Sequence, residues 1–367
     1  MNIIDRVPEY IRSLIPYAAG KPIEEVEREY GIEDSVKIAS NENPLGPSPK
    51  AVKALAERLC QLHQYPDGDC FYLKRGLAAK LGVSANRLIF GNGSNELIEL
   101  AVRTFMQSED EAVMAHPAFI VYRLVVQAAG GRAKVVPLRN FTHDLDAMAR
   151  AITERTRVVF LANPNNPTGT IYRKSEWEQF LERLGPEILL VVDEAYFEYV
   201  TDADYPNSLS YHKEGKTILT VRTFSKLYGL AGLRIGYGIG AEEMIGLMQR
   251  VRQPFNVNAA AQWAALAAME DEEHVERSLR VNREGMDYLR KEITRLGLEQ
   301  IPSQANFILI RVGSGQDFFH QLLRRGVIVR SMEAYDMPEY VRVTVGKMEE
   351  NVRFIREFES IIKVKGR

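Results

Sequence analysis

Four segments of the sequence combine turn-forming residues with side chains that can bind anions or exchange protons. They are GNGSNELIEL at 91–100, NPNNPTG at 163–169, DEAY at 193–196 and RTFSK at 222–226. Each follows an apolar run typical of a buried strand, namely RLIF at 87–90, RVVFLA at 157–162, ILLVV at 188–192 and TILTV at 217–221. Because the carboxyl ends of parallel strands open on one edge of an α/β sheet, we expect the four segments to converge there.

The residue types suit a ligand that has an aromatic ring and a phosphate group. A GNGSNE turn at a helix start offers backbone N–H groups, the helix dipole and the Ser94 hydroxyl to an anion. Asp193 can keep a pyridine nitrogen protonated, and Asn166 and Tyr196 can hydrogen-bond a ring hydroxyl. Lys226 can form an imine with an aldehyde and, as a free amine, can move protons.

Each of these features has a simpler explanation when it is taken alone. A glycine–serine turn usually caps a helix, a single aspartate often sits in a turn, and most lysines are solvated. NPNNPTG could be only a proline-stiffened loop. The order of the four segments, each after its own strand, favours the ligand-binding interpretation. Ser225 and Arg234, close to Lys226 in the chain, add two further phosphate partners.

The elements that must position these residues predict a large α/β domain followed by a smaller α+β domain. A chain of 367 residues is longer than one hydrophobic core usually supports. Ser48 and Pro49 are typical of a helix start, and the apolar positions that follow at helical spacing are Val52, Leu55, Leu59 and Leu62. AVMA at 112–115 is a further predicted strand. The predicted division is an N-terminal segment at 1–44, a large domain at 45–270 and a small domain at 271–367.

The small domain is predicted from a change in pattern near residue 270. A long helix carries a stripe that runs from Val275 through Met286 to Leu296. NFILIRV, the helix QDFFHQLLRR, VIVR and YVRVTVG follow, and an amphipathic helix closes the chain. In YVRVTVG, valines alternate with Arg342 and Thr344, so this pattern alone predicts a surface arginine on an edge strand.

Composition and motifs exclude several classes of function. The net charge of −2, with acids and bases mixed, predicts no nucleic-acid or membrane partner. The first residues contain acids and prolines where a signal peptide needs an apolar core, so we expect a cytoplasmic protein in which Cys60 and Cys70 are free thiols. The six histidines have no metal-ligand spacing, so no metal is expected. GYGIGA at 236–241 lacks the context of a dinucleotide-binding turn, and no serine lies in a nucleophile elbow.

At this point the sequence resembles a known family. SNENPLGPSP, YPDG, GNGSNELI, NPNNPTG, VVDEAYFEY and RTFSKLYGLAGLRIGY resemble, in this order, the motifs of fold-type I pyridoxal-phosphate aminotransferases, and most closely the histidinol-phosphate aminotransferase family. The resemblance runs from about Tyr17 to Gly346. It implies a mainly parallel sheet sandwiched by helices, pyridoxal 5′-phosphate as cofactor, and a homodimer on which the N-terminal segment also packs.

The resemblance also implies a role for individual residues. Lys226 would be the lysine that holds the cofactor and moves the proton, with Asp193 at the pyridine nitrogen and Asn166 and Tyr196 at the ring oxygen. The residues implied around the phosphate are Gly93, Ser94, Asn95, Thr223, Ser225 and Arg234. Tyr65 would reach the phosphate from the neighbouring subunit, and Phe119 would stack on the ring. The residues implied in substrate binding are Tyr17, Asn43, Arg330 and Arg342.

Two positions depart from the family pattern. Asn95 stands where the family usually has Asp, and Phe119 stands where Tyr is common. Asn can still cap a helix and Phe can still stack on a ring, so the cofactor is unaffected. Phe119 removes a hydroxyl near the substrate, which leaves substrate specificity more open than the chemistry.

The resemblance implies transfer of an amino group between L-histidinol phosphate and 2-oxoglutarate, which gives imidazole acetol phosphate and glutamate. This is a ping-pong reaction of histidine biosynthesis, in which the cofactor alternates between its pyridoxal and pyridoxamine forms. The closest alternative is an aromatic amino-acid aminotransferase that acts on phenylalanine or tyrosine. Two others are a decarboxylase of a phosphorylated amino acid and a non-catalytic cofactor-binding module; the intact lysine and the lack of a DNA-binding region count against the latter.

Overall fold

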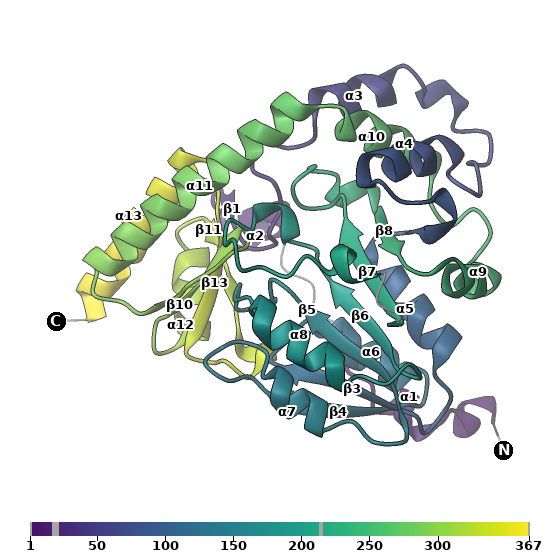
Figure 1. Cartoon of the computed structure of the whole chain (residues 1–367). Coiled ribbons are helices and arrows are strands. Elements are labelled where there is room, and N and C mark those ends of the chain that lie inside the picture. The colour runs from purple at the N-terminus through teal and green to yellow at the C-terminus, as the bar shows by residue number, and fades with distance from the viewer. Residues whose placement is uncertain (1, 17–21, 213–215, 366–367) are drawn as a thin grey trace.

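A seven-stranded sheet forms the centre of the larger part of the molecule (Figure 1). The computed structural model describes residues 2–16, 22–212 and 216–365. The strands are β2 (Leu88–Gly91), β3 (Glu111–His116), β4 (Arg132–Pro137), β5 (Thr156–Ala162), β6 (Leu189–Asp193), β7 (Ile218–Thr223) and β8 (Gly236–Ile239), in the order β2-β8-β7-β6-β5-β3-β4. β8 is antiparallel to both of its neighbours and the other pairs are parallel. β2 therefore points the same way as β5, β6 and β7, and the carboxyl ends of these strands share one edge.

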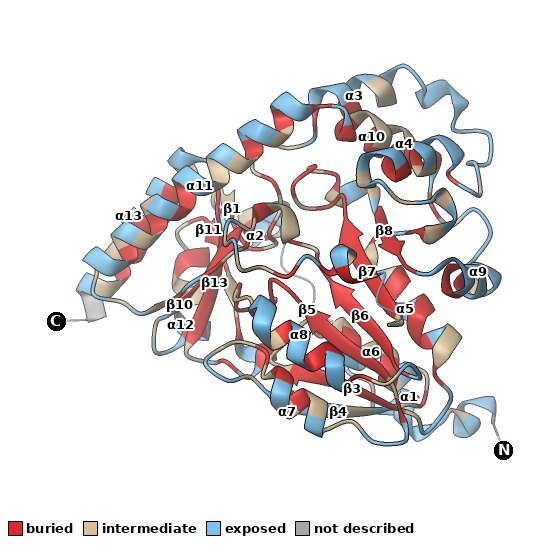
Figure 2. Ribbon diagram, viewed as in Figure 1, coloured by how far each residue is buried: buried red, intermediate tan, exposed pale blue. Residues whose placement is uncertain are grey.

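Helices cover the sheet, and apolar side chains fill the space between them. The helices are α5 (Ser94–Phe105), α6 (Val121–Ala128), α7 (Leu145–Arg150), α8 (Lys174–Arg183) and α9 (Glu242–Val251). α5 contacts α6 and α9, whereas α7 contacts α8. In Figure 2 the strands of this sheet other than the edge strand β4 are almost entirely buried, while the helices alternate buried and exposed positions. The core between the sheet and α5 includes Leu97, Ile98, Val159 and Val191, all fully buried.

A second, antiparallel sheet lies in the C-terminal part of the chain. Its strands are β9 (Gln300–Ile301), β10 (Phe307–Arg311), β12 (Arg330–Ser331) and β13 (Tyr340–Thr344), in the order β12-β13-β10-β9. The helices of this part are α11 (Glu272–Arg295), α12 (Gly315–Leu323) and α13 (Met348–Lys365). The predicted stripe of the long helix is buried here, because Met286, Leu289 and Ile293 pack against Ile308 and Phe354.

The N-terminal segment contacts both parts. The Gln127 side chain on α6 donates to the Tyr10 carbonyl of α1 (Glu9–Arg12) over 3.0 Å. In α2 (Ile23–Tyr30), Val26 is buried against Leu323 and Ile328. β1 (Val36–Lys37) pairs in parallel with β11 (Val327–Ile328). After it, α3 (Pro49–Ala56) and α4 (Phe71–Leu81) pack on α10 (Ala259–Met269).

Most of the predicted elements are present, and three differences have physical causes. Neither β4 nor β8 was predicted, because β4 is a half-exposed edge strand and β8 is rich in glycine. The helix predicted from Ser48 ends at Ala56, and the chain then forms a short 3₁₀ turn at 59–61. The edge-strand interpretation of Arg342 is wrong, because β13 lies between β12 and β10 and Arg342 is only 6% exposed.

Candidate active site

A cavity of about 410 Å³ opens at the shared carboxyl edge of β5, β6 and β7 and is closed by residues of the C-terminal sheet. Its size is typical of a small-molecule site. The predicted residues that line it are Ser94, Asn95, Phe119, Asn166, Asp193, Tyr196, Thr223, Ser225, Lys226, Arg234, Arg330 and Arg342. Residues 39–42, from the irregular segment after β1, also line it.

Lys226 lies in the loop after β7, buried in this cavity. Its Nζ donates to the Ser40 carbonyl over 3.2 Å and lies 5.7 Å from the centre of the Tyr196 ring. Burial, reinforced by the positive charge of Arg342, lowers the pKa of Lys226 to about 8. An amine with this pKa is partly uncharged near neutral pH, so it can act as a nucleophile and as a base.

Asp193 is the last residue of β6 and is also buried. Its Oδ2 accepts a hydrogen bond from the Tyr122 hydroxyl over 2.8 Å, and its Oδ1 accepts one from the Ala195 N–H over 3.1 Å. Burial raises the pKa of Asp193 to about 6, and the bond from Tyr122 limits this rise. The carboxylate is therefore fixed in direction and ionised above about pH 6.

The start of α5 and Arg234 form an end of the cavity suited to an anion. α5 has no side-chain cap on its first turn, so its backbone N–H groups face the cavity beside Ser94 and Asn95. A Cβ on Gly93 would lie 2.7 Å from Arg234 Nη2, which shows how closely the guanidinium approaches the turn. Thr223 Oγ1 accepts from the Ser225 N–H over 3.0 Å and lies at the same end of β7.

The opposite wall carries two arginines from neighbouring strands. Arg330 on β12 and Arg342 on β13 are directly opposed in the antiparallel register. Arg342 donates to the Asn166 side chain and, over 3.0 Å, to the Ala39 carbonyl, and its guanidinium carbon lies 5.1 Å from the Phe307 ring centre. Among the described residues, the buried Nε of Arg342 has no hydrogen-bond partner. A donor left over in a buried guanidinium is a place for a ligand oxygen.

The NENP motif contributes to the cavity through different residues from the one predicted. Asn43 does not line the cavity; its side chain donates to the Leu227 carbonyl over 2.7 Å and to Ser278 over 2.9 Å. Asn41 lines it instead, and its amide donates to the Tyr196 hydroxyl over 2.8 Å. Glu42 also lines it and pairs with Lys37 over 2.8 Å.

The predicted residue Tyr65 does not line this cavity. Tyr65 is 85% exposed and stacks on Phe255 with ring centres 4.9 Å apart, away from the cavity of its own chain. Tyr17 lies outside the described residues.

Asn41, Tyr122 and Tyr335, like Glu42, line the cavity but were not predicted from the sequence. Tyr122 follows Phe119 by three positions in HPAFIVY, close to one helical turn, and Asn41 belongs to the SNENPLG motif, so both had a local signal. Tyr335, in the 3₁₀ turn Glu333–Tyr335, had none. No group of three potential metal ligands occurs among the residues that the structure describes.

Comparison with known proteins relates this geometry to a family. Residues 33–358 match the family model described as aminotransferase class I and II. The histidinol-phosphate aminotransferase of Moorella thermoacetica is 51% identical over 98% of this chain and 94% of its own length. That of Methylobacillus flagellatus is 48% identical over 99% of both chains.

Solved structures of aminotransferases superpose on this chain over nearly its whole length. The histidinol-phosphate aminotransferase of Sinorhizobium meliloti, in complex with pyridoxal-5′-phosphate, superposes with a TM-score of 0.88 at 25% identity over 98% of both chains. A double mutant of the Thermus thermophilus aspartate aminotransferase superposes with a TM-score of 0.83 at 25% identity, over 98% of this chain and 99% of its own. These likenesses confirm the fold class that the motifs predict.

Proposed function

Because the chain belongs to the class I and II aminotransferases, we propose that it transfers an amino group between L-histidinol phosphate and 2-oxoglutarate with pyridoxal phosphate as cofactor. The observation that carries this proposal is the single cavity that combines an amine of lowered pKa, a fixed carboxylate and an anion-binding helix start. Relatives that are about half identical to this chain over nearly its whole length are named histidinol-phosphate aminotransferases. Their names support histidinol phosphate as the substrate. The reaction would belong to histidine biosynthesis, and we place it in the cytoplasm.

The residues of the cavity fit the groups of the cofactor. Asp193 would pair with the pyridine nitrogen, Lys226 with the aldehyde, and Asn166 and Tyr196 with the ring oxygen. The start of α5 and the side chains of Ser94, Asn95, Thr223, Ser225 and Arg234 would hold the phosphate. Phe119 would cover one face of the ring. When bound, the cofactor supplies an electron sink for the carbanion that forms at the substrate Cα.

The chain's own residues then have separable tasks. Asp193, oriented by Tyr122, holds a proton at the ring nitrogen, which favours the transition state more than the ground state. Lys226 Nζ takes the proton from the donor Cα, and its lowered pKa leaves it able to accept this proton near neutral pH. Residues 39–42, Phe119 and Tyr335 close the cavity against water.

The arginine pair suits the anionic groups of both types of donor. Histidinol phosphate has a dianionic phosphate and no carboxylate, whereas phenylalanine, tyrosine and glutamate all have an α-carboxylate. Arg330 and Arg342 can bind both types of anion in turn, as a two-substrate transaminase requires. Phe119 lacks the hydroxyl that is common at this position in the family. The test must therefore distinguish the proposed activity from that of an aromatic amino-acid aminotransferase.

The cofactor assignment is tested by borohydride reduction. The purified protein should absorb visible light, and reduction followed by peptide mapping should find the cofactor on Lys226 alone. Label on any other lysine contradicts the assignment. Lys226→Arg is the matched control, because it keeps the charge and cannot form the imine.

The substrate assignment is tested by steady-state kinetics on a panel of donors. Two extra charge-assisted hydrogen bonds of roughly 1.5–3 kcal/mol each should favour histidinol phosphate over phenylalanine by about a hundredfold or more in kcat/KM. Arg330→Ala should reduce turnover of histidinol phosphate more than that of phenylalanine. Arg311→Ala, at the exposed end of the otherwise buried strand β10, is the control. Equal or better use of phenylalanine would establish the aromatic aminotransferase.

The proposed assembly is a homodimer. A set of exposed apolar side chains lies around α3, α4 and the loop before α10: Val52, Leu59, Leu62, Tyr65, Phe71, Tyr72 and Phe255. Exposed apolar residues gathered in this way are typical of a protein interface. Tyr65 would reach the cofactor phosphate of the partner subunit, which explains a large exposed tyrosine outside the cavity of its own chain.

The proposed domain division follows the two sheets. The large domain would comprise residues 45–270 and the small domain 271–367, so that Asp271, between α10 and α11, marks the boundary. The cavity would then lie between domains, a common place for a ligand site.

A further inference from the structure

A polar contact joins the end of β3 to the connection between β12 and β13. His116, the last residue of β3, lies with Nε2 2.8 Å from Oδ2 of Asp336, which directly follows the 3₁₀ turn Glu333–Tyr335. Because a carboxylate only accepts, the ring nitrogen donates this hydrogen bond. The two residues are 220 positions apart in the chain: His116 ends a strand of the seven-stranded sheet, and Asp336 lies in the connection between β12 and β13 of the C-terminal sheet.

Each partner is adjacent to a residue that lines the cavity. Phe119 follows His116 by three positions, and Pro117 between them is held by the Asn165 side chain, which donates to its carbonyl over 3.2 Å. Tyr335 immediately precedes Asp336 and is buried. The contact therefore links the segment that carries the Phe119 wall to the segment that carries the Tyr335 wall.

Packing around this contact is thin. A groove of about 770 Å³ runs beside it between the two parts, lined by residues that include Leu138, Phe141 and Met337. Across the groove, Phe141 alone among the described partly buried apolar residues packs against the C-terminal cluster that includes Met337 and Tyr340, with ring centres of Phe141 and Tyr340 5.8 Å apart. Where few apolar contacts fix two segments, a directional polar contact has more influence on their spacing.

We propose that His116 and Asp336 are positioning residues that set the spacing between the Phe119 and Tyr335 walls, and thereby the affinity for the amino donor. This inference rests on the proposed function for its choice of substrate. Neither residue touches the cavity itself, so both act through their neighbours. The loss of the contact should loosen substrate binding and leave the chemical step at Lys226 intact.

Other charged side chains lie near this contact, and the contact itself is exposed to solvent. Arg123 on α6 lines the same shallow pocket as His116 and Asp336, and Glu339 lines the groove on the other side. The side chains of His116 and Asp336 are 36% and 83% exposed, and exposed ion pairs contribute little to stability. The expected effect is therefore on substrate affinity and local mobility rather than on global stability.

The backbone at Asp336 guides the choice of variants. Asp336 has φ of +56°, a conformation that Asn, Gly and His also adopt readily. Asp336→Asn keeps a neutral acceptor and Asp336→Gly removes it, so neither should strain the turn. Glu333→Gln is the matched control, because it removes an exposed carboxylate from the same turn.

The first experiment measures the kinetics of both half-reactions. Asp336→Gly should raise KM for the donor about threefold with kcat within about twofold, and Asp336→Asn should have a smaller effect. His116→Asn combined with Asp336→Gly should be no worse than either alone, since both remove one contact. The exchanged pair His116→Asp with Asp336→His should restore KM. Glu333→Gln should leave KM unchanged.

The second experiment does not depend on the substrate. Hydrogen exchange of the cofactor-free protein should be faster for peptides covering 332–340 in Asp336→Gly than in the wild type, with peptides of β5 and β6 unchanged. If histidinol phosphate proves not to be a donor, this readout and the KM for glutamate still test the contact. Unchanged KM and exchange in every variant, or an equal effect of Glu333→Gln, would overturn the proposal.

Discussion

Asp193 is a carboxylate kept in a buried position where its charge is unfavourable. Its two hydrogen bonds, from Tyr122 and from the Ala195 backbone, do not compensate for the loss of water, so its pKa stays near 6 instead of 3.8. A group whose pKa is raised by folding destabilises the folded state once it is ionised. The cofactor-free protein should therefore lose stability as the pH rises from about 4 to 6, by roughly 3 kcal/mol at most.

Asp193→Asn should remove this destabilisation. At pH 7 the cofactor-free variant should be more stable than the wild type by about 1–3 kcal/mol, and the difference should vanish below about pH 4. Turnover should fall by far more than tenfold, because the proton at the ring nitrogen is lost. Urea unfolding across pH, with Asp287→Asn on α11 as a control for lost surface charge, measures the effect. A variant less stable at every pH would contradict it.

The cavity residues that could be predicted from the sequence are those next to a strand end. Asp193 and Lys226 follow apolar runs directly, so their convergence follows from the parallel sheet. Asn41 and Tyr335 could not be predicted in this way, because their places depend on how the C-terminal sheet and the segment after β1 close over the edge. The NENP motif predicted the correct segment but not the correct residue, because Asn41 lines the cavity and Asn43 does not.

At the scale of elements, the start of α5 depends on a glycine in another strand. A Cβ on Gly236 of β8 would lie 2.6 Å from the Ser94 backbone nitrogen and 2.9 Å from the Arg222 carbonyl. β8 was overlooked in the sequence because its glycines weaken the strand pattern, yet this glycine allows β8 to pass close to the anion-binding turn.

Gly236→Ala should displace the start of α5 and weaken cofactor binding about tenfold or more, because each misplaced N–H costs a charge-assisted hydrogen bond. Fluorescence titration of the cofactor-free protein measures this affinity. Gly246→Ala in α9 is the control, because an added Cβ there meets nothing within 4 Å. Equal affinities for the two variants would contradict the role of Gly236.

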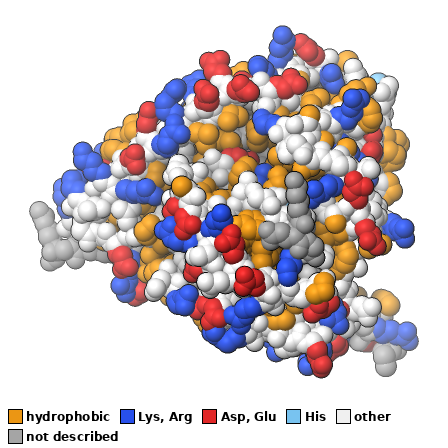
Figure 3. Space-filling model, viewed as in Figure 1, with side chains coloured by type: hydrophobic (Ala, Val, Ile, Leu, Met, Phe, Trp, Pro, Cys, Tyr) orange, Lys and Arg blue, Asp and Glu red, His pale blue; other side chains and the backbone are white. Residues whose placement is uncertain are grey.

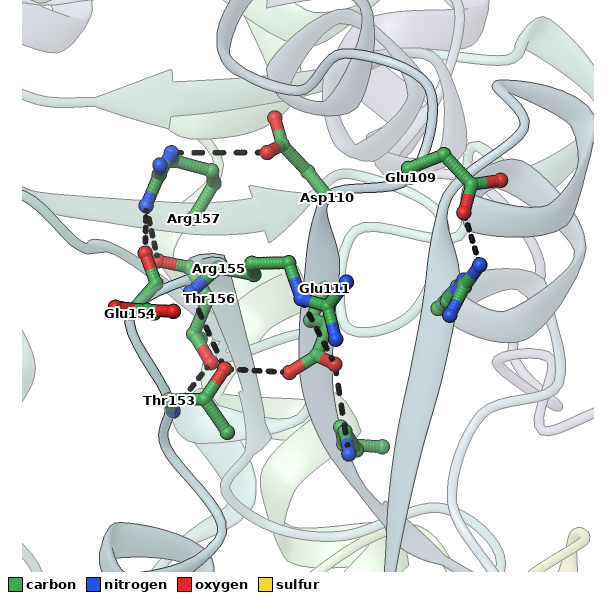
Figure 4. A network of polar contacts seen from close by, with 10 residues as sticks. Glu109, Asp110, Glu111, Thr153, Glu154, Arg155, Thr156 and Arg157 are labelled. Atoms are coloured by element: carbon green, nitrogen blue, oxygen red, sulfur yellow. Dashed lines mark hydrogen bonds and ion pairs between the residues drawn. The ribbon is translucent and has the colours of Figure 1, made fainter.

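The opposite edge of the sheet is held by a polar network (Figure 4). At the start of β3, Glu111 is 3% exposed and accepts a hydrogen bond from the Thr153 hydroxyl over 2.6 Å. Lys134 Nζ lies 3.4 Å from the same carboxylate. The hydrogen bond from Thr153, together with Lys134, holds the pKa of Glu111 below its ordinary value of 4.5.

A carboxylate whose pKa is lowered by folding stabilises the folded state when the pH is above the pKa that the group has in the unfolded chain. This stabilisation is lost as the pH falls through the pKa that the group has in the folded protein. Glu111→Gln should therefore lower the unfolding midpoint at pH 7 and show little difference from the wild type in strong acid. Activity at pH 7 should be unchanged, because the network lies far from the cavity. Glu109→Gln, in an exposed pair with Arg132, is the control and should have a smaller effect. A pH-independent loss would contradict this account.

At the scale of the whole molecule, acidic and basic residues nearly balance, with a formal net charge of −2. On the face shown in Figure 3, acidic and basic side chains are intermixed. No helix in the described part of the chain is long and apolar enough to cross a membrane. The notable surface is the exposed apolar set around Tyr65 and Phe255, which a single chain leaves in contact with water.

A mixture of two inactive chains tests the proposed homodimer. Lys226→Ala and Tyr65→Ala chains, unfolded and refolded together in equal amounts, should recover about a quarter of the wild-type activity, since half the dimers are mixed and each has one intact site. Each chain alone should stay far less active. Sedimentation gives the assembly state. A fully active monomer, or no recovery on mixing, would rule out a shared site.

The segment that closes the cavity has a consequence for how the chain is made. Val36 donates from its backbone to Gly326 over 2.8 Å, and Asn41 donates to Thr344, 303 positions later. Residues 36–41 are translated long before these partners. A growing chain therefore cannot complete the cavity until the C-terminal sheet has been synthesised, and only then can this segment close over the site that would hold Lys226 beside Ser40.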